Sequence, residues 1–340
     1  MRFVLTDEQR GFAGSLDDLL GGSDVPRVAR DWADGKHDLG LHLWSRLAEL
    51  GVHGLLVDER YGGLGADPVD LVVAFEQLGR HAVPGPWVES VAFLPAFAPT
   101  QEDLVGPLAA GQVATIAAPP HTPRALDADV AARALLVEGS SLRPTETGEL
   151  HRSVDPTRRL FDVSDVAAEE DAGRAVDAGH AFDLATLACS AQMLGAGERL
   201  LGESVEYART RRQFGRAIGE FQVLKHAMAD VRVGLDSARP LIYGAALSIG
   251  GGDASRDVSA AKVAAGDSAY RAARTALQVH GAIGYTAEHD LGLWITKVRA
   301  LVGAWGTPSF HRARVLDALV EPTPVVEPTP VVEPVETRGA

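Results

Sequence analysis

The sequence predicts an α+β protein that is mainly α-helical, and two patterns support this. Apolar residues recur at three- and four-residue spacings in the first hundred residues and again from about 182 to 318, as they do along amphipathic helices. Between them lie short apolar runs bounded by Pro, Gly and Asp, which are typical of strands. We therefore expect an N-terminal helical domain (1–110), a reduced, barrel-like middle β domain (111–180), a C-terminal four-helix bundle (181–318) and a Pro-rich disordered tail (319–340).

The N-terminal segment contains two helices joined by a tight loop. Apolar spacing over 43–50 and 71–78 marks the helices, and the loop at 58–68 holds three glycines and a proline. Asp67 is placed to cap the second helix, because a carboxylate can accept hydrogen bonds from the free amides of a first turn. Prolines within 82–86 end that helix, since proline has no amide donor and clashes with the preceding turn.

The middle segment is predicted to form a small sheet. Residues 113–117 and 134–137 are apolar runs of strand length, and polar turns interrupt 145–163. We expect three to five strands.

Long helices follow. The apolar face over 184–205 marks a helix that we expect to end near residues 214–215, with Gly215 as its C-cap. A second helix begins near Glu220 and is expected to end either at Pro240 or at the glycines 250–252.

A third helix is predicted over about 257–280 and a fourth after Pro308, which completes an antiparallel bundle. The motif Val-Glu-Pro-Thr-Pro-Val then occurs at 320–325 and again at 326–331. Proline at this density favours an extended, polyproline-like chain, so we expect a solvated tail that joins no core.

Composition excludes several classes of protein. Hydrophobic residues make up 46% and charged residues 23%, which fits a folded globular chain. No apolar run approaches the roughly 20 residues of a membrane span, and the first residues do not resemble a secretory signal, so we expect a cytoplasmic protein. The net charge of −14 opposes binding to nucleic acid. Cys189 is the single cysteine, which excludes an internal disulfide or a Cys-rich metal site.

A series of motifs resembles the acyl-CoA dehydrogenases, flavoproteins that desaturate acyl-CoA thioesters between the α and β carbons. The motifs are LTDEQ (5–9), YGGLGA (61–66), EQLGR (76–80), DPTRR (155–159), YARTRRQFG (207–215), IGEFQ (218–222), QVHGAIGY (278–285) and WGT (305–307). The resemblance covers nearly the whole chain up to about residue 318. It implies an FAD cofactor and an acyl-CoA substrate, with an electron-transfer flavoprotein as the usual electron acceptor.

Two residues at the end of the first bundle helix match cofactor contacts of the family. The resemblance implies that Arg211 reaches across a subunit interface to the FAD pyrophosphate, a role that suits a planar and permanently charged guanidinium. Phe214 matches an aromatic residue that packs near the neighbouring chain's cofactor. From the residues alone, Arg211 would complement the helix dipole and Phe214 would be an ordinary core residue.

Four further positions match cofactor contacts nearer the C-terminus. By the resemblance, Gln278 and the backbone at Gly281 touch the partner chain's flavin nucleotide, and Thr307 supplies a hydroxyl to a flavin. Ala282 stands where a second glycine is usual. The residues alone predict a helix C-terminus closed by Gly281 and a turn-forming threonine.

The family's catalytic base is missing. Removal of the α proton needs a positioned side chain, normally glutamate, with its pKa tuned by burial. The two positions that carry it in different branches of the family match Trp305 and Ala185 here. Asp183 is the nearest acid, and we expect it to be a helix N-cap. The family's Trp-Ile-Thr-like strand, which holds the flavin ring, has no counterpart between 88 and 180.

The losses are selective, because residues that contact a neighbour's flavin remain while the base and the flavin cradle are gone. The hypothesis is therefore a non-catalytic subunit of a heteromeric, α2β2-like acyl-CoA dehydrogenase, with FAD shared across its interface with a second subunit and a steroid or other bulky acyl-CoA as substrate. One alternative is a flavin-free scaffold or acyl-CoA-binding protein. Another is an active homomeric dehydrogenase with an unrecognised base such as Asp183. Cys189 and His280 are expected to be structural.

Overall fold

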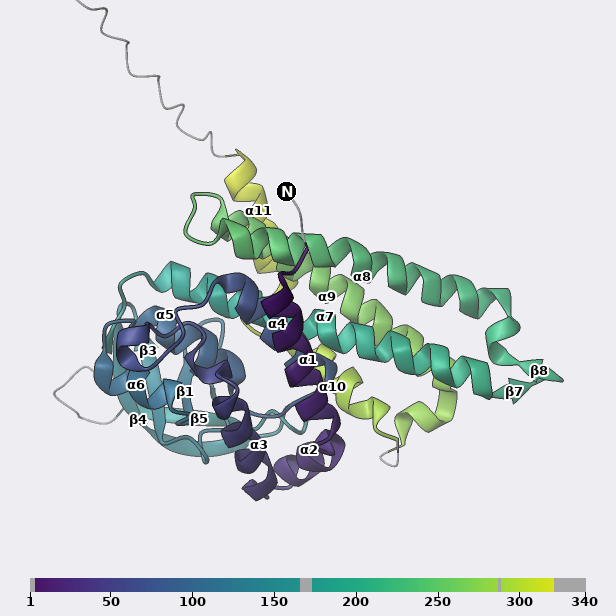
Figure 1. Cartoon of the computed structure of the whole chain (residues 1–340), viewed down its shortest axis with the longest axis horizontal. Helices are drawn as coiled ribbons and strands as arrows, with labels where there is room; N and C mark the ends of the chain where they lie inside the picture. Colours follow the sequence, from purple (N-terminus) through teal and green to yellow (C-terminus); the bar gives the residue numbers. More distant parts are fainter. Residues whose placement is uncertain (1–3, 166–172, 287–288, 321–340) are drawn as a thin grey trace, which may run out of the picture.

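Helices form both ends of the described chain in the computed structural model, which describes residues 4–165, 173–286 and 289–320 (Figure 1). The N-terminal helices are α1 (Asp7–Gly21), α2 (Val25–Ala33), α3 (Asp38–Glu49), α4 (Pro68–Arg80), α5 (Leu94–Phe97) and α6 (Glu102–Ala109). The expected helices at 43–50 and 71–78 correspond to α3 and α4. Asp67 is the N-cap of α4, as predicted, and its amide donates to the Asp70 carboxylate at 3.2 Å.

A small sheet follows the first six helices. Its strands are β1 (Ala114–Ala117), β2 (Ala125–Leu126), β3 (Arg133–Glu138), β4 (Ser141–His151), β5 (Leu160–Asp165) and β6 (Gly173–Arg174). The order is β1-β3-β4-β5-β2, with β6 on β4, and only the β1–β3 pair is parallel within the described residues. Strands β1 and β2 also lie close together, so the sheet is nearly closed, as the barrel-like prediction requires. The described part of this sheet has six strands rather than three to five, because two-residue pairings such as β2 leave no periodicity in a sequence.

The C-terminal elements are α7 (Ala178–Thr210), β7 (Arg212–Gln213), β8 (Arg216–Ala217), α8 (Gln222–Ser248), α9 (Ala254–His280), α10 (Leu291–Gly303) and α11 (Pro308–Val320). Helices α7, α8 and α9 lie side by side, and α10 packs on α7 and α9. The prediction that the fourth helix follows Pro308 is incomplete, because α10 precedes it. Helix α10 was missed because its sequence is apolar on most of its circumference and shows little helical periodicity.

The end of α7 differs from the prediction. Helix α7 stops at Thr210, and Phe214 and Gly215 form the turn of the β7–β8 hairpin, with φ angles of 52° and 84°. Two successive residues with positive φ are typical of the tight turns that match strand twist. Gly215 is therefore a hairpin residue and not a helix C-cap.

The structure also corrects the predicted role of Asp183 and decides where α8 ends. Asp183 is not an N-cap, because α7 begins at Ala178 and its N-cap is Asp177, which accepts from the His180 amide at 3.0 Å. Helix α8 runs through Pro240 and ends at Ser248, just before the glycines. The packing of α8 on α9 outweighs the backbone hydrogen bond that Pro240 cannot make.

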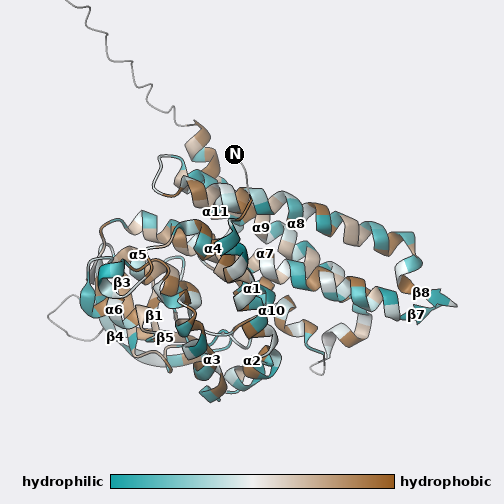
Figure 2. Cartoon of the chain, viewed as in Figure 1, coloured by the Kyte–Doolittle hydropathy of each residue, from teal (hydrophilic) through white to brown (hydrophobic). Residues whose placement is uncertain are grey.

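Apolar residues concentrate on the inward faces of the helices and on the buried strand β1, whereas the β7–β8 hairpin is hydrophilic (Figure 2). A buried ion pair crosses this core. Lys297 of α10 lies 3.3 Å from the Asp155 carboxylate and donates to the Thr157 hydroxyl at 3.1 Å. Asp155 also accepts from the Thr157 amide and hydroxyl. Through these contacts the DPTRR motif connects the sheet to α10.

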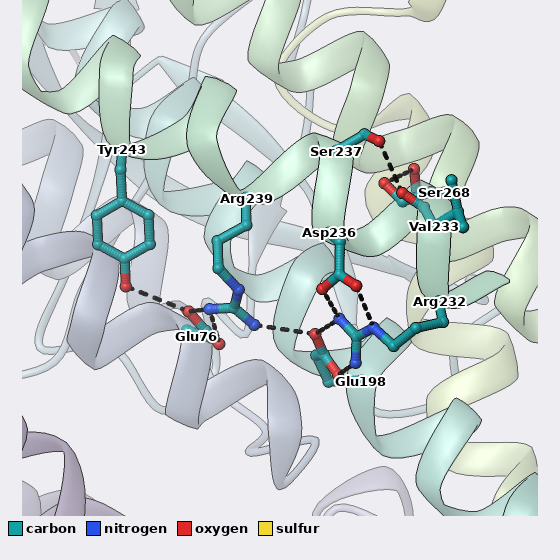
Figure 3. Close-up of polar contacts among 10 residues, drawn as sticks. Glu76, Glu198, Arg232, Val233, Asp236, Ser237, Arg239, Tyr243 and Ser268 are labelled. Atoms are coloured by element: carbon teal, nitrogen blue, oxygen red, sulfur yellow. Dashed lines mark hydrogen bonds and ion pairs between the residues drawn. The ribbon is translucent and has the colours of Figure 1, made fainter. Parts of the chain in front are cut away.

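An ion-pair network joins α4, α7 and α8 (Figure 3). Arg239 of α8 donates to Glu76 of α4 at 2.7 and 2.8 Å and to Glu198 of α7 at 2.9 Å. Arg232 makes a two-pronged contact with Glu198 at 2.6 and 2.7 Å. Burial opposes ionisation of Glu198, but the hydrogen bonds from both arginines outweigh it and lower its pKa.

We expect this network to make the protein acid-sensitive. A carboxyl group whose pKa is lower in the folded state than its ordinary 4.5 stabilises the fold above that value, and the stabilisation is lost as the pH falls through the lowered pKa. Glu198→Gln should cost about 1–2 kcal/mol at pH 7, since both arginines are partly exposed and solvent screens them. It should also flatten the decline in melting temperature between pH 6 and 3 (roughly the range of carboxyl titration). Glu206→Gln, on the exposed face of α7, is the control; an equal effect from both would contradict the assignment.

Among the described residues, no helix combines the length and the apolar character needed to cross a bilayer.

Candidate functional site

A groove of about 420 Å³ lies where the β7–β8 hairpin meets the ends of α7 and α9. Arg211 is the C-cap of α7 and lines the groove together with Phe214 at the hairpin turn. Phe214 is 91% exposed, so the interpretation of this residue as ordinary core is wrong. Figure 1 shows the hairpin at the end of the bundle remote from the sheet, where its residues can contact another molecule.

Aromatic rings build the walls of this groove. Tyr207 stacks on His280 with ring centroids 4.3 Å apart, and Phe221 lies edge-on to Phe214 at 6.2 Å. The Arg216 guanidinium sits 4.2 Å from the centre of the Phe221 ring. Guanidinium groups beside aromatic faces suit a ligand that has both phosphates and flat rings. Tyr207 and Phe221 were not predicted as site residues, although they belong to the YARTRRQFG and IGEFQ motifs.

The end of α9 contributes the second set of predicted residues. Gly281 is the C-cap of α9, with φ 61° and ψ −137°, a conformation that strongly favours glycine. It lines the groove of Arg211 and also a neighbouring groove of about 1020 Å³, which Gln278 lines as well. Ala282 is exposed in the 3-10 turn that follows. The structure therefore brings Arg211, Phe214 and the end of α9 to one end of the bundle.

Thr307 lies apart from these residues. Its hydroxyl accepts from the Phe310 amide at 3.2 Å, so it caps the first turn of α11, as the turn-forming interpretation predicts. Trp305, two residues before Thr307, packs near Phe182 at the start of α7, whereas Arg211 lies at the end of that helix. A helix of 33 residues spans roughly 50 Å. Thr307 and Arg211 of one chain therefore cannot hold the same flavin.

The two residues at the positions that match the family's base are buried in the core. Trp305 is 1% exposed and its ring packs against Phe93 at 5.2 Å, and Ala185 is fully buried in α7. Neither an indole nor a methyl group can accept the proton. Trp305 has a φ of 55°, an uncommon conformation for a bulky residue, so the surrounding packing must hold it in place.

Asp183 is engaged in structural contacts. It is 3% exposed, and its carboxylate accepts from Arg314 and from the Ser255 hydroxyl, each at 2.6 Å. Both carboxylate oxygens are therefore already engaged by other residues, so the geometry gives no support to Asp183 as the proton acceptor.

Cys189 lies in the core, whereas His280 lines the groove of Arg211. Cys189 is fully buried, and burial raises the pKa of its thiol. His280 is the last residue of α9, where its Nδ1 lies 2.9 Å from the Ala276 carbonyl oxygen. Burial lowers its pKa, which favours the neutral imidazole.

One buried acid was not predicted. Glu89 is 1% exposed in a π-helical turn, Val88–Phe93, and neither carboxyl oxygen has a hydrogen-bond partner among the described residues. Burial raises its pKa, and the charge of Arg158 only partly opposes this. The sequence signal is a single acid within the stretch 87–94, which is apolar apart from Glu89 and Ser90, and a buried neutral carboxyl group is a natural result there.

Comparison with known proteins agrees with the resemblance. Residues 6–98 match the N-terminal domain of acyl-CoA dehydrogenases, and residues 172–320 match their C-terminal domain. The chain is 34% identical to the acyl-CoA dehydrogenase IpdE2 of Mycobacterium tuberculosis over 263 residues, which is 75% of this chain and 79% of IpdE2.

Two solved structures share the fold. The ChsE4-ChsE5 complex of Mycobacterium tuberculosis contains a chain that matches with a TM-score of 0.82 and 23% identity, covering 95% of this chain and all of that one. A variant of the Tcur3481-Tcur3483 steroid acyl-CoA dehydrogenase matches with a TM-score of 0.83 and 21% identity, covering 93% of this chain and 98% of that one. On its similarity to IpdE2 and the two matching domains, the chain belongs to the acyl-CoA dehydrogenase family.

Proposed function

We propose that this chain is the non-catalytic subunit of a heteromeric acyl-CoA dehydrogenase, in which a different subunit carries the base. The observation that carries the proposal is the contrast between two ends of α7. At its start, Trp305 and Ala185 fill the positions of the base, and at its end Arg211 and Phe214 stand exposed beside an open groove.

The residues at the hairpin fit part of an FAD molecule, whereas the residues packed around Trp305 do not. Arg211 offers a two-pronged charge for a diphosphate, and Tyr207, Phe214 and Phe221 offer flat faces for a ring. Trp305 instead packs against Phe93, so an indole fills the position that matches the family's base. We therefore assign the groove to the cofactor of the partner subunit, whose bound flavin would accept the hydride during desaturation.

The similar proteins support a pairing of unlike chains. The ChsE4-ChsE5 and Tcur3481-Tcur3483 structures each name two chains, and the second is described as a steroid acyl-CoA dehydrogenase. By analogy we assign a steroid or other bulky acyl-CoA as substrate and an electron-transfer flavoprotein as the electron acceptor. A scaffold without flavin would have no use for Arg211, Phe214 and Gln278 together.

The test is to purify the chain alone and together with the acyl-CoA dehydrogenase encoded beside it. We expect a colourless protein alone, and a yellow complex that is bleached by acyl-CoA and contains about half the flavin of a homotetramer. Visible absorbance and native mass spectrometry measure both properties. A protein that is yellow by itself and is bleached by acyl-CoA would falsify the proposal, and a colourless protein that forms no complex would favour the scaffold.

A further inference from the structure

A fully buried acid, Asp127, lies where the N-terminal helices meet the sheet. It directly follows β2, and its Oδ1 accepts from the Trp32 indole of α2 at 3.1 Å and from the Arg159 amide, just before β5, at 3.3 Å. Its Oδ2 has no hydrogen-bond partner among the described residues. A neutral carboxyl group with one unpaired oxygen costs much less in a core than an ionised group in the same place.

The backbone and the packing fix both members of this contact. Asp127 has a φ of 52°, and its amide donates to the Arg159 carbonyl oxygen at 2.7 Å. Trp32 is 1% exposed and lies so close to α3 that a Cβ atom at Gly40 would be 2.3 Å from its ring. A charge on Asp127 can therefore reach water only if α2 and α3 separate from the sheet together.

The charged groups around Asp127 do not pair with it. Arg159 donates through its guanidinium to Asp129, which follows β2, and to Nε2 of His37, at the start of α3, at 2.6 Å. Because arginine can only donate, His37 is neutral in this contact, and burial lowers its pKa accordingly. The charge of Arg158 favours ionisation of Asp127, whereas the charge of Asp129 opposes it.

These surroundings link a proton on Asp127 to the contact. Burial raises its pKa to about 7, although the Trp32 indole and Arg158 lower it. The ordinary value is 3.8, so the closed contact holds a proton that an open, hydrated Asp127 releases. The contribution of this proton to closure is complete below pH 3.8 and is lost as the pH rises to about 7.

We propose that protonation of Asp127 holds α2 and α3 on the sheet, and that its ionisation separates these two helices from the sheet. Figure 1 shows both helices at the lower edge of the molecule, remote from α8. Arg30 of α2 pairs with Asp290, just before α10, so the opened state loses this contact as well. The inference is independent of the proposed function, because it concerns a single chain and needs no cofactor.

The test compares the full chain with Asp127→Asn by hydrogen–deuterium exchange, expressed as protection relative to the intrinsic exchange rate at each pH. Asparagine keeps the oxygen that accepts from Trp32, tolerates the positive φ and cannot ionise. We expect the protection of α2 in the unmodified chain to fall, relative to that in Asp127→Asn, by at least tenfold between about pH 5 and about pH 8, and to stay constant above. The protection of α8 should not change.

Two further variants make the test specific. Asp34→Asn removes the same charge from a side chain that is 68% exposed at the end of α2, and it should keep the profile of the unmodified chain. Trp32→Phe removes a donor that favours the anion, so the fall in protection should occur at higher pH. His37, beside Asp38, has the opposite dependence on pH because its pKa is lowered, but every variant retains it, so the comparison cancels its contribution.

Three results would overturn the proposal. The first is the same pH profile in the unmodified chain and in Asp127→Asn, and the second is lower protection of α2 in Asp127→Asn at every pH. The third is a profile of Asp34→Asn that matches that of Asp127→Asn. If Asp127→Asn does not fold, Trp32→Phe decides, since an unchanged midpoint in that variant contradicts the role of Asp127.

Discussion

Arg211→Gln should weaken FAD binding by the heteromeric complex, so that the purified complex loses FAD. If the guanidinium pairs with the diphosphate of the partner's cofactor, its loss removes charge-assisted hydrogen bonds of about 1.5–3 kcal/mol, which weakens FAD binding roughly 10- to 150-fold. The complex purified with this variant should be paler, and added FAD should restore its activity. Absorbance at the flavin bands and an FAD titration of the apo-complex measure the effect.

Two further variants make this test specific. Arg211→Lys keeps the charge but not the planar fork, so it should recover only part of the affinity. Arg209→Gln, two residues earlier, removes the same charge from an exposed side chain that has a weak ion pair with Glu206 at 3.9 Å, and should retain full flavin content. If Arg209→Gln and Arg211→Gln lose flavin equally, the assignment of the groove is wrong.

Lys297→Ala should destabilise the fold more than any surface substitution. Its side chain is 7% exposed, and its ammonium group compensates the carboxylate of Asp155, whose side chain is fully buried. Removal of one partner leaves a buried charge without compensation, which costs about 3–5 kcal/mol. Urea unfolding followed by circular dichroism measures the free energy of unfolding. Lys36→Ala, at an exposed pair, should change it by less than about 0.5 kcal/mol.

A double variant separates charge from packing. Asp155→Asn/Lys297→Met keeps an oxygen to accept from the Thr157 amide and replaces the ammonium with an apolar side chain of similar length. Replacement of a whole buried pair is often nearly neutral, so most of the lost stability should return. A double variant as unstable as Lys297→Ala would show that the ammonium's bond to the Thr157 hydroxyl, and not its charge, holds the sheet to α10.

The local patterns in the sequence were sufficient to predict the helices whose apolar faces repeat regularly. They were also sufficient to recognise the order of the family motifs. The sequence was likewise sufficient to predict that Trp305 and Ala185 stand at the two positions that match the family's base, because that prediction depends only on the identity of each residue. The local patterns were insufficient at the end of α7, where the φ angles of two turn residues, rather than hydrophobic spacing, decide that a hairpin follows.

Other features required the tertiary structure because they join residues far apart in the chain. Glu76, Glu198 and Arg239 meet only when α4, α7 and α8 pack together, and Asp155 meets Lys297 only when the sheet lies on α10. The separation of Thr307 from Arg211 likewise follows from the length of a straight helix. The sequence alone therefore determined which chemical groups stand at the positions of the family motifs. Packing alone decided which of these groups are buried and which are exposed, because side-chain exposure depends on contacts between elements that no local pattern records.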